Sequence, residues 1–318
     1  MTRRVAAIDC GTNSIRLLVA DLDPAAGTLV DLDRRMRIVR LGQGVDRTGR
    51  LAPEALERTF AACREYAKAI GELGAERVRF VATSASRDAE NREVFRAGVR
   101  EILGVEPEVI SGDEEAALSF AGATRELAGT GAVETPYLVV DIGGGSTEFV
   151  LGTDRPEAAR SVDIGCVRMT ERHLRADPPT QDRIAAATAD IEAAIARAAE
   201  VVPMDRARTL VGLAGSVTTV AGIALELPEY DSTAIHHSRL TLDQVRTVTA
   251  RLLASTHAER TGIPVLHPGR VDVIGAGALV LRTIMERTGL TEVVVSEHDI
   301  LDGIAWSSVE APGAVGDW

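Results

Sequence analysis

The segment from Asp141 to Phe149 reads DIGGGSTEF and combines three consecutive glycines with two acids. Glycines allow positive φ angles, and they let a ligand approach the backbone because no Cβ stands in the way. Consecutive backbone N–H groups in such a turn form an anion nest. Asp141 before the turn and Glu148 after it suit a divalent cation that carries a phosphate. The alternative that the residues leave open is a plain glycine hairpin with two solvated acids.

A second copy of this pattern occurs near the N-terminus, where Val5 to Asp23 again reads as strand, turn and strand. When the two copies are aligned on their aspartates, the following residues coincide: Asp9 with Asp141, Gly11 with Gly143, Ser14 with Ser146, and Arg16 with Glu148. An internal duplication of this kind predicts two similar α/β lobes with a cleft between them, where the turns clamp one ligand.

Two further segments carry residues that could contact an anion. Gly215 and Ser216 lie between a strand-like run and a helix-like run, and the free N–H groups of a helix N-terminus attract phosphate. Three acids, Asp113, Glu114 and Glu115, open another predicted helix. Capping and the helix dipole account for the first two. Glu115 is therefore the acid that remains for a role in the cleft.

The length, composition and charge of the chain limit the classes of protein to which it can belong. A length of 318 residues predicts two domains, and 45% hydrophobic with 26% charged residues is typical of an ordered globular chain. We expect domains at residues 1–125 and 126–318, joined by a linker at residues 124–136, with the last helix packing back on the first lobe.

No apolar run approaches the length of a membrane span, so we expect a cytoplasmic protein without a membrane segment. The net charge of −12 argues against DNA binding through a basic face.

The cysteines and histidines give little sign of a metal site. The three cysteines have no CxxC spacing, which argues against a disulfide framework and against a thiolate zinc site. The six histidines include the neighbours His236 and His237 but no HExxH pair. We therefore expect these two to be surface loop residues, with metal ligation by imidazole as the less favoured alternative.

Taken together, the sequence resembles the exopolyphosphatase and guanosine pentaphosphate phosphohydrolase family, within the actin, Hsp70 and sugar kinase superfamily. The matching stretches occur in the family's order over nearly the whole chain: DCGTNSIR at Asp9, VRLGQGVDRTGRL at Val39, ATSASRDAEN at Ala82, ISGDEEA at Ile110, DIGGGSTEF at Asp141 and GLAGSVTTVAG at Gly212. The resemblance implies a duplicated ribonuclease H-like fold. It also implies magnesium-dependent hydrolysis of the terminal phosphate of inorganic polyphosphate or, alternatively, of pppGpp.

The same resemblance implies roles for individual residues. Glu115 corresponds to the family's catalytic glutamate, which orients or deprotonates the attacking water. The residues implied to bind phosphate or substrate are Asn13, Ser14, Arg87, Gly143, Gly144, Gly145, Ser146, Gly215 and Ser216. Those implied to hold Mg²⁺ are Asp141, Glu148 and Asp9. A homodimer is a further expectation from the resemblance.

Other functions remain open at this stage. An ATP-using kinase or ATPase would keep the fold, because a fold does not fix a function. An idle sensor of polyphosphate or nucleotides would keep the binding residues without turnover. The chain ends at Trp318 without the helical domain of longer relatives, so we expect short polyphosphates or pppGpp as substrates. In the closing segment from Ser296 to Gly303 we assign no ligand role, since Leu301 and Asp302 replace the Arg-Glu that is common in the family.

Overall fold

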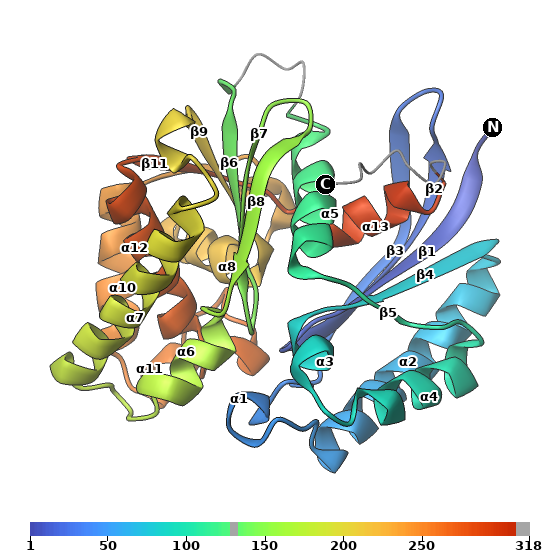
Figure 1. The fold of residues 1–318 in the computed structure, drawn as a ribbon, viewed down its shortest axis with the longest axis horizontal. Coiled ribbons are helices and arrows are strands. Elements are labelled where there is room, and N and C mark those ends of the chain that lie inside the picture. The colour runs from blue at the N-terminus through green and yellow to red at the C-terminus, as the bar shows by residue number, and fades with distance from the viewer. Residues whose placement is uncertain (128–132, 310–318) are drawn as a thin grey trace. The chain divides into compact units, whose positions relative to one another are not determined.

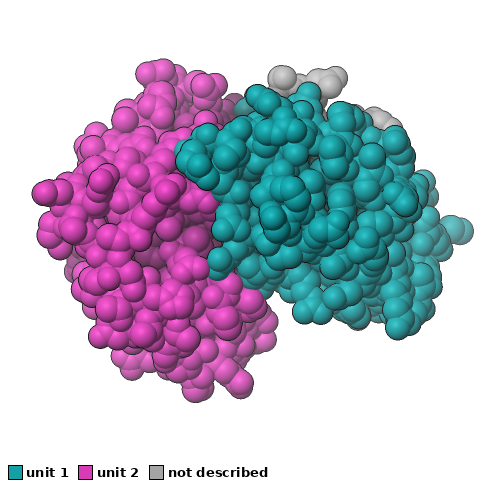
Figure 2. Space-filling model, turned by 90° about the horizontal axis from the view of Figure 1, so that it is seen from below, with its two compact units in different colours: residues 1–122, 300–318 teal, residues 123–299 magenta. Residues whose placement is uncertain are grey.

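The computed structural model describes residues 1–127 and 133–309, which form two compact α/β units (Figures 1 and 2). Unit 1 contains Met1–Gly122 and the C-terminal segment from Ile300, and unit 2 contains Ala123–Asp299. The predicted linker at residues 124–136 lies partly outside the described residues. Among the described residues, no helix combines the length and the apolar character that crossing a membrane requires.

Unit 1 is built on a five-stranded sheet in the order β3-β2-β1-β4-β5. Its strands are β1 (Arg3–Cys10), β2 (Ser14–Asp23), β3 (Thr28–Ile38), β4 (Arg77–Ala82) and β5 (Glu108–Val109). Its helices are α1 (Val45–Thr48), α2 (Pro53–Leu73), α3 (Ser84–Asp88), α4 (Arg92–Leu103), α5 (Gly112–Thr124) and α13 (Ile300–Ser307). The division between the units falls inside α5.

Both faces of this sheet are buried, because side chains in a strand alternate between its two faces. Ala6 and Ile8 of β1 belong to the cluster that includes Tyr66 of α2. Val5 and Ala7 belong instead to a cluster with α13. Figure 1 shows α2 and α4 on one side of the sheet and α13 on the other. A nearly continuous apolar run is what such a two-sided strand needs.

Unit 2 is built on a six-stranded sheet in the order β10-β11-β9-β6-β7-β8. Its strands are β6 (Tyr137–Ile142), β7 (Thr147–Gly152), β8 (Pro156–Val162), β9 (Thr209–Leu213), β10 (Arg239–Thr241) and β11 (Glu292–Val295). Its helices are α6 (Cys166–His173), α7 (Gln181–Ala199), α8 (Ala214–Ala224), α9 (Ser232–Ile235), α10 (Leu242–Ala254), α11 (His257–Thr261) and α12 (Ile274–Thr288), with single 3₁₀ turns at Met204–Arg206 and Pro268–Arg270.

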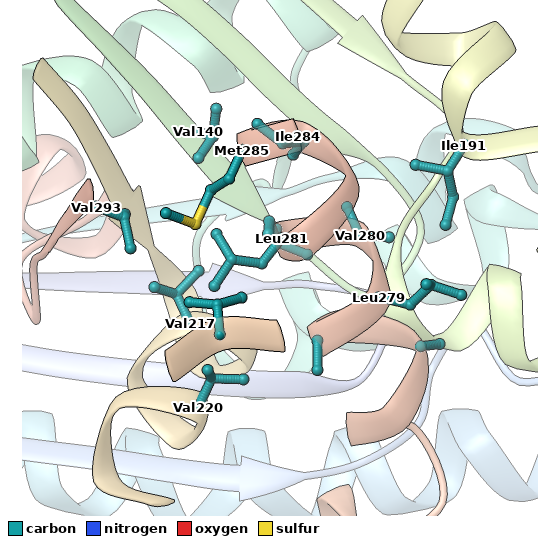
Figure 3. Packing of buried hydrophobic residues seen from close by; sticks show 14 of the residues in the cluster. Val140, Ile191, Val217, Val220, Leu279, Val280, Leu281, Ile284, Met285 and Val293 are labelled. Atoms are coloured by element: carbon teal, nitrogen blue, oxygen red, sulfur yellow. The ribbon is translucent and has the colours of Figure 1, made fainter. Parts of the chain in front are cut away.

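The long helix α12 forms the centre of the core of unit 2. Leu281 and Met285 lie in one buried cluster with Val140 of β6 and Val293 of β11. Figure 3 shows these side chains together with those of α7 and α8. The apolar residues of α12 therefore hold α8, and the turn that precedes it, against the sheet.

The two sheets share one topology. In each, the first strand pairs antiparallel with the second, the second pairs antiparallel with the third, and the first also pairs parallel with a later strand. Strands β6, β7, β8, β9 and β11 thus repeat the order of β1 to β5, and β10 adds an edge strand to unit 2. The predicted duplication of a ribonuclease H-like α/β fold is confirmed.

We predict that close packing of α13 on α5 makes Gly303→Ala destabilising. A Cβ at Gly303 would lie 2.1 Å from the backbone carbonyl oxygen of Leu118, which cannot rotate away. Overpacking of this kind typically costs ~1–3 kcal/mol. Gly71→Ala in α2 is the control, because nothing lies within 4 Å of the added methyl. That change should stabilise the protein by up to about 1 kcal/mol. Thermal unfolding of both variants checks this, and an unchanged midpoint for Gly303→Ala would contradict the packing.

Candidate functional site

The first glycine turn joins β1 to β2 in unit 1. The Gly11 N–H donates to the Ser14 carbonyl oxygen at 2.9 Å and closes the turn. N–H groups of the loop Val39–Gly42 donate to the carbonyls of Thr12 and Asn13 at 2.8 to 3.0 Å. These contacts hold the turn by its carbonyls, and the backbone N–H groups of Thr12 and Asn13 find no acceptor among the described residues. They are the donors that an anion would use.

The second glycine turn, in unit 2, repeats this arrangement. The Gly143 N–H donates to the Ser146 carbonyl oxygen at 3.1 Å. N–H groups of Gly165–Arg168, where α6 begins, donate to the three glycine carbonyls at 2.9 to 3.2 Å. Within residues 1–127 and 133–309, the N–H groups of Gly144, Gly145 and Ser146 have no acceptor. Three consecutive free donors have the arrangement of an anion nest.

Two glycines outside the turns make this geometry possible, and sequence reasoning missed both. A Cβ at Gly42 would lie 2.3 Å from Cγ2 of Thr12. A Cβ at Gly165 would lie 2.2 Å from the carbonyl carbon of Gly144. Each glycine therefore lets a second segment of backbone approach its turn closely enough to bind the carbonyls. The glycine content of VRLGQG was a weak signal for the first, and nothing in the sequence singled out the second.

A buried arginine adds a side-chain donor beneath the second turn. Nε of Arg168 donates to the carbonyl oxygen of Gly145 at 2.7 Å, and the arginine side chain is only 11% exposed. The contact fixes the turn from inside unit 2 and places positive charge near it. Sequence reasoning missed this residue too, because an arginine in the first turn of a helix has no motif of its own.

Asp141 and Glu148 lie directly opposite each other on β6 and β7. They are 6% and 1% exposed, and Glu148 Oε1 accepts a hydrogen bond from the Ser161 hydroxyl at 2.7 Å. Carboxylate oxygens are the ligands that divalent cations such as Mg²⁺ and Ca²⁺ prefer in proteins, and the two residues present them from neighbouring strands. The donor set therefore fits a metal beside the anion nest.

The corresponding pair in unit 1 carries opposite charges. Asp9 and Arg16 occupy paired positions on β1 and β2. Asp9 Oδ2 accepts hydrogen bonds from Arg16 Nε at 3.0 Å and from Nη2 at 2.7 Å. Arg16 thus already supplies the charge that a metal would bring. The role of Asp9 as a metal ligand stays a prediction, and this contact weighs against it.

Glu115 and Arg87 are in contact within unit 1. Arg87, from α3, donates from Nη1 to Glu115 Oε2 at 3.1 Å and to the Ile110 carbonyl oxygen at 3.0 Å. Glu115 is 8% exposed and lies in the first turn of α5, where the Ser111 hydroxyl caps the helix by accepting from the Glu114 N–H at 3.1 Å. The structure thus brings together the predicted catalytic acid and the predicted substrate-binding arginine.

Helix α3 also connects Arg87 to the first turn. The hydroxyls of Thr12 and Ser84 share a hydrogen bond of 2.8 Å. In the neighbouring Asn13, Oδ1 is buried and has no hydrogen-bond partner among the described residues. A buried polar atom without a partner is costly, which favours a ligand or a water at this position. Asn13, Arg87 and Glu115 therefore come from connected segments of one unit.

Gly215 and Ser216 lie where β9 passes into α8. The residue before them, Ala214, has φ of 64°, a strained conformation for a residue with a side chain. Nη1 of Arg270 donates to the Gly215 carbonyl oxygen at 2.9 Å and to the Thr219 hydroxyl at 3.2 Å. A Cβ at Gly215 would lie 1.9 Å from Cζ of Arg270. Arg270 is a further cation at a predicted phosphate contact, and no motif in the sequence points to it.

Cys166 connects the two predicted phosphate contacts of unit 2. Its backbone N–H donates to the Gly143 carbonyl oxygen at 2.9 Å, and its thiol interacts with the Ser216 side chain. Burial raises the pKa of the Cys166 thiol above its usual value, so the thiol is neutral and is a poor nucleophile. All three cysteines are free and buried, in agreement with the absence of a disulfide framework.

The prediction that His236 and His237 are surface loop residues is wrong. Their rings stack with centroids 3.7 Å apart, and both residues are half-buried. His236 Nε2 lies 3.1 Å from Glu126 Oε2, and His298 Nδ1 lies 3.3 Å from the same oxygen. The sequence could not show this, because the three segments meet only in the folded unit 2.

This cluster has the composition of a metal site, but its hydrogen bonds favour another reading. The N–H of Glu297 donates to His236 Nδ1 at 3.1 Å. A neutral imidazole that accepts at Nδ1 carries its proton at Nε2, so His236 donates to Glu126. Histidines that bind a metal instead donate from the nitrogen that faces away from it. The cluster is therefore better described as a carboxylate that bridges two imidazoles.

Comparison with known proteins agrees with these features. The family model described as "Ppx/GppA phosphatase family" matches residues 18–311. Exopolyphosphatase 2 of Mycobacterium tuberculosis is 51% identical, over 96% of this chain and 98% of its own length. A solved structure of an exopolyphosphatase-like protein has a TM-score of 0.93 and 46% identity, and the match covers 96% of this chain and 97% of that one.

A more distant relative represents the other activity of the group. Guanosine-5'-triphosphate,3'-diphosphate pyrophosphatase of Aeromonas salmonicida is 29% identical over 95% of this chain. The match covers 58% of that longer protein. The family model spans most of the chain, and the actin-like duplication and both glycine turns agree with it. The chain belongs to the Ppx/GppA phosphatase family.

Proposed function

We propose that the protein is a cytoplasmic exopolyphosphatase that removes the terminal phosphate of inorganic polyphosphate with the help of Mg²⁺. The observation that carries the proposal is the arrangement in unit 2, where buried, opposed acids flank three free N–H donors. The carboxylate oxygens fit a cation, and the backbone N–H groups fit an anion. A metal-bound phosphate needs both kinds of contact. The relative from Mycobacterium tuberculosis, named Exopolyphosphatase 2, supports polyphosphate as the substrate.

Asp141 and Glu148 are the residues that would hold the metal. When bound, Mg²⁺ would neutralise the non-bridging oxygens of the terminal phosphate. The N–H groups of Gly144, Gly145 and Ser146 would bind further oxygens of the same group. Phosphoryl transfer has a loose transition state, so positioning and charge neutralisation account for most of the catalysis.

Glu115 is the residue that would orient and deprotonate the attacking water. In this structure its carboxylate accepts a hydrogen bond from Arg87 at 3.1 Å, which fixes its orientation. The guanidinium of Arg87 has further N–H groups for a phosphate oxygen, because its planar fork carries five donors.

The second candidate is the removal of a phosphate from pppGpp. The relative from Aeromonas salmonicida, named for that type of substrate, favours it, although the identity is lower. A kinase or ATPase of the same fold and an idle sensor are weaker alternatives. A homodimer stays a prediction.

Phosphate release from four substrates separates these functions. Tripolyphosphate, long-chain polyphosphate, pppGpp and ATP would each be assayed with and without Mg²⁺. The proposal predicts release from both polyphosphates only with the metal. Release from pppGpp alone would support the second candidate, release from ATP alone an ATPase, and release from none of them the sensor.

Glu115→Gln should remove most turnover and leave substrate binding largely intact. The amide cannot accept the proton of the water, and general acid–base groups typically contribute ~10²–10⁴-fold to the rate. Steady-state kinetics and equilibrium binding of tripolyphosphate measure the two effects separately. Glu114→Gln, one residue earlier in the same helix, is the control and should have a rate close to wild type. A near wild-type rate for Glu115→Gln would reject the assignment.

Glu148→Gln should remove most of the stabilisation that Mg²⁺ binding gives to the folded protein. With Mg²⁺ at 100 times its dissociation constant, wild type should gain ~2.7 kcal/mol. The variant should lose most of that gain, whereas Glu57→Gln, on the exposed side of α2, should keep it. An equal gain in Glu148→Gln and wild type would exclude Glu148 as a ligand.

A further inference from the structure

A groove on unit 1 lies between Arg87 of α3 and the arginines of α4. It encloses about 540 Å³, a volume within the usual range for ligand sites. Arg87, Arg92 and Arg96 line it, together with the segment Glu106–Ser111. The side chain of Arg87 donates to Glu115 in the same structure. Arg87 therefore both lines the groove and contacts the residue that would activate water.

The arginines of α4 form one edge of this groove. Residues four apart on a helix lie about 5–6 Å apart on the same face, so Arg92 and Arg96 are neighbours. Arg92 is exposed, and no hydrogen bond or ion pair engages its side chain among the described residues. Arg96 is held by Glu93 at 2.9 Å and by Glu106 at 2.6 Å, and its buried Nε has no partner there.

The acids that line the groove are already neutralised by arginines. Glu106 pairs with Arg96 at 2.6 Å and with Arg100 at 3.1 Å. Glu108 pairs with Arg79 at 2.7 Å. Arg92 is thus the lining cation whose charge is available. Charge-assisted contacts between guanidinium groups and phosphate oxygens are the interaction that such a groove offers.

We propose that this groove binds the inner phosphates of a polyphosphate chain whose terminal phosphate lies at Arg87 and Glu115. The inference rests on the proposed exopolyphosphatase function and deepens it. The polyphosphate leaves the catalytic residues along α4. Its phosphates pair with Arg92 first and then with Arg96. The groove therefore makes the enzyme favour longer chains over tripolyphosphate.

The test compares the specificity constants for long-chain polyphosphate and tripolyphosphate in one set of variants. In Arg92→Gln the ratio of kcat/KM for the long chain to that for tripolyphosphate should fall roughly threefold to fivefold, as for a solvent-exposed charge pair. In Arg92→Glu it should fall further. Both effects should shrink as salt is raised from about 0.05 to 0.5 M, because screening weakens exposed charge pairs.

Arg64→Gln is the matched control, since Arg64 of α2 is an exposed arginine of the same unit and does not line the groove. Its ratio should equal that of wild type. An unchanged ratio in both Arg92 variants would overturn the proposal that the groove binds polyphosphate. The proposed exopolyphosphatase function would still stand.

A binding measurement separates this inference from the failure of the function itself. Long-chain polyphosphate would be titrated calorimetrically into the wild-type protein in EDTA, where hydrolysis is suppressed. Weaker binding by Arg92→Glu than by Arg64→Gln would support polyphosphate binding in the groove even if no polyphosphate were hydrolysed. No binding to wild type, or equal binding by both variants, would overturn it.

Discussion

The carbonyl groups of both glycine turns are held by the segment of chain that packs behind them, and the candidate site depends on this constraint. A turn whose carbonyls were free would present mixed donors and acceptors to a ligand, and an anion would meet repulsion as well as attraction. Here the loop Val39–Gly42 and the start of α6 engage the carbonyls, so the outward-facing backbone groups are donors. Selectivity for an anion is thus built into the backbone before any side chain contributes.

Duplication explains why the turns are alike and why their flanking side chains differ. The same pair of cross-strand positions holds Asp9 and Arg16 in unit 1, but Asp141 and Glu148 in unit 2. Arg16 donates to Asp9 in the first pair, whereas the second pair consists of two acids. One difference between the two copies of the repeat therefore separates an ion pair from a pair of carboxylates of the type that the proposed metal site uses.

Much of the fold and of the candidate site could be predicted because the signals are local. Three glycines between two strands, or three acids at a helix start, are legible in a few residues, and the repeat then fixed the strand order of both units. Gly42, Gly165 and Arg270 were not predictable, because their importance lies in contacts with residues far away in the chain. The histidines were misjudged for the same reason, since their partners Glu126 and His298 join them only on folding. The pairing of Asp9 with Arg16 was within reach of the sequence, because the alignment of the copies already set them opposite each other.

The discontinuous composition of unit 1 has a consequence for the order in which the chain is made. Val5, Ala7 and Leu18 emerge from the ribosome early, but the residues of α13 that cover them emerge almost 300 positions later. At ~5–20 residues per second, this delay amounts to about 15 to 60 s. Until the last helix is made, α13 cannot cover this apolar face of the sheet, although unit 2 is by then synthesised whole. Covering this face is therefore a late step in the folding of unit 1.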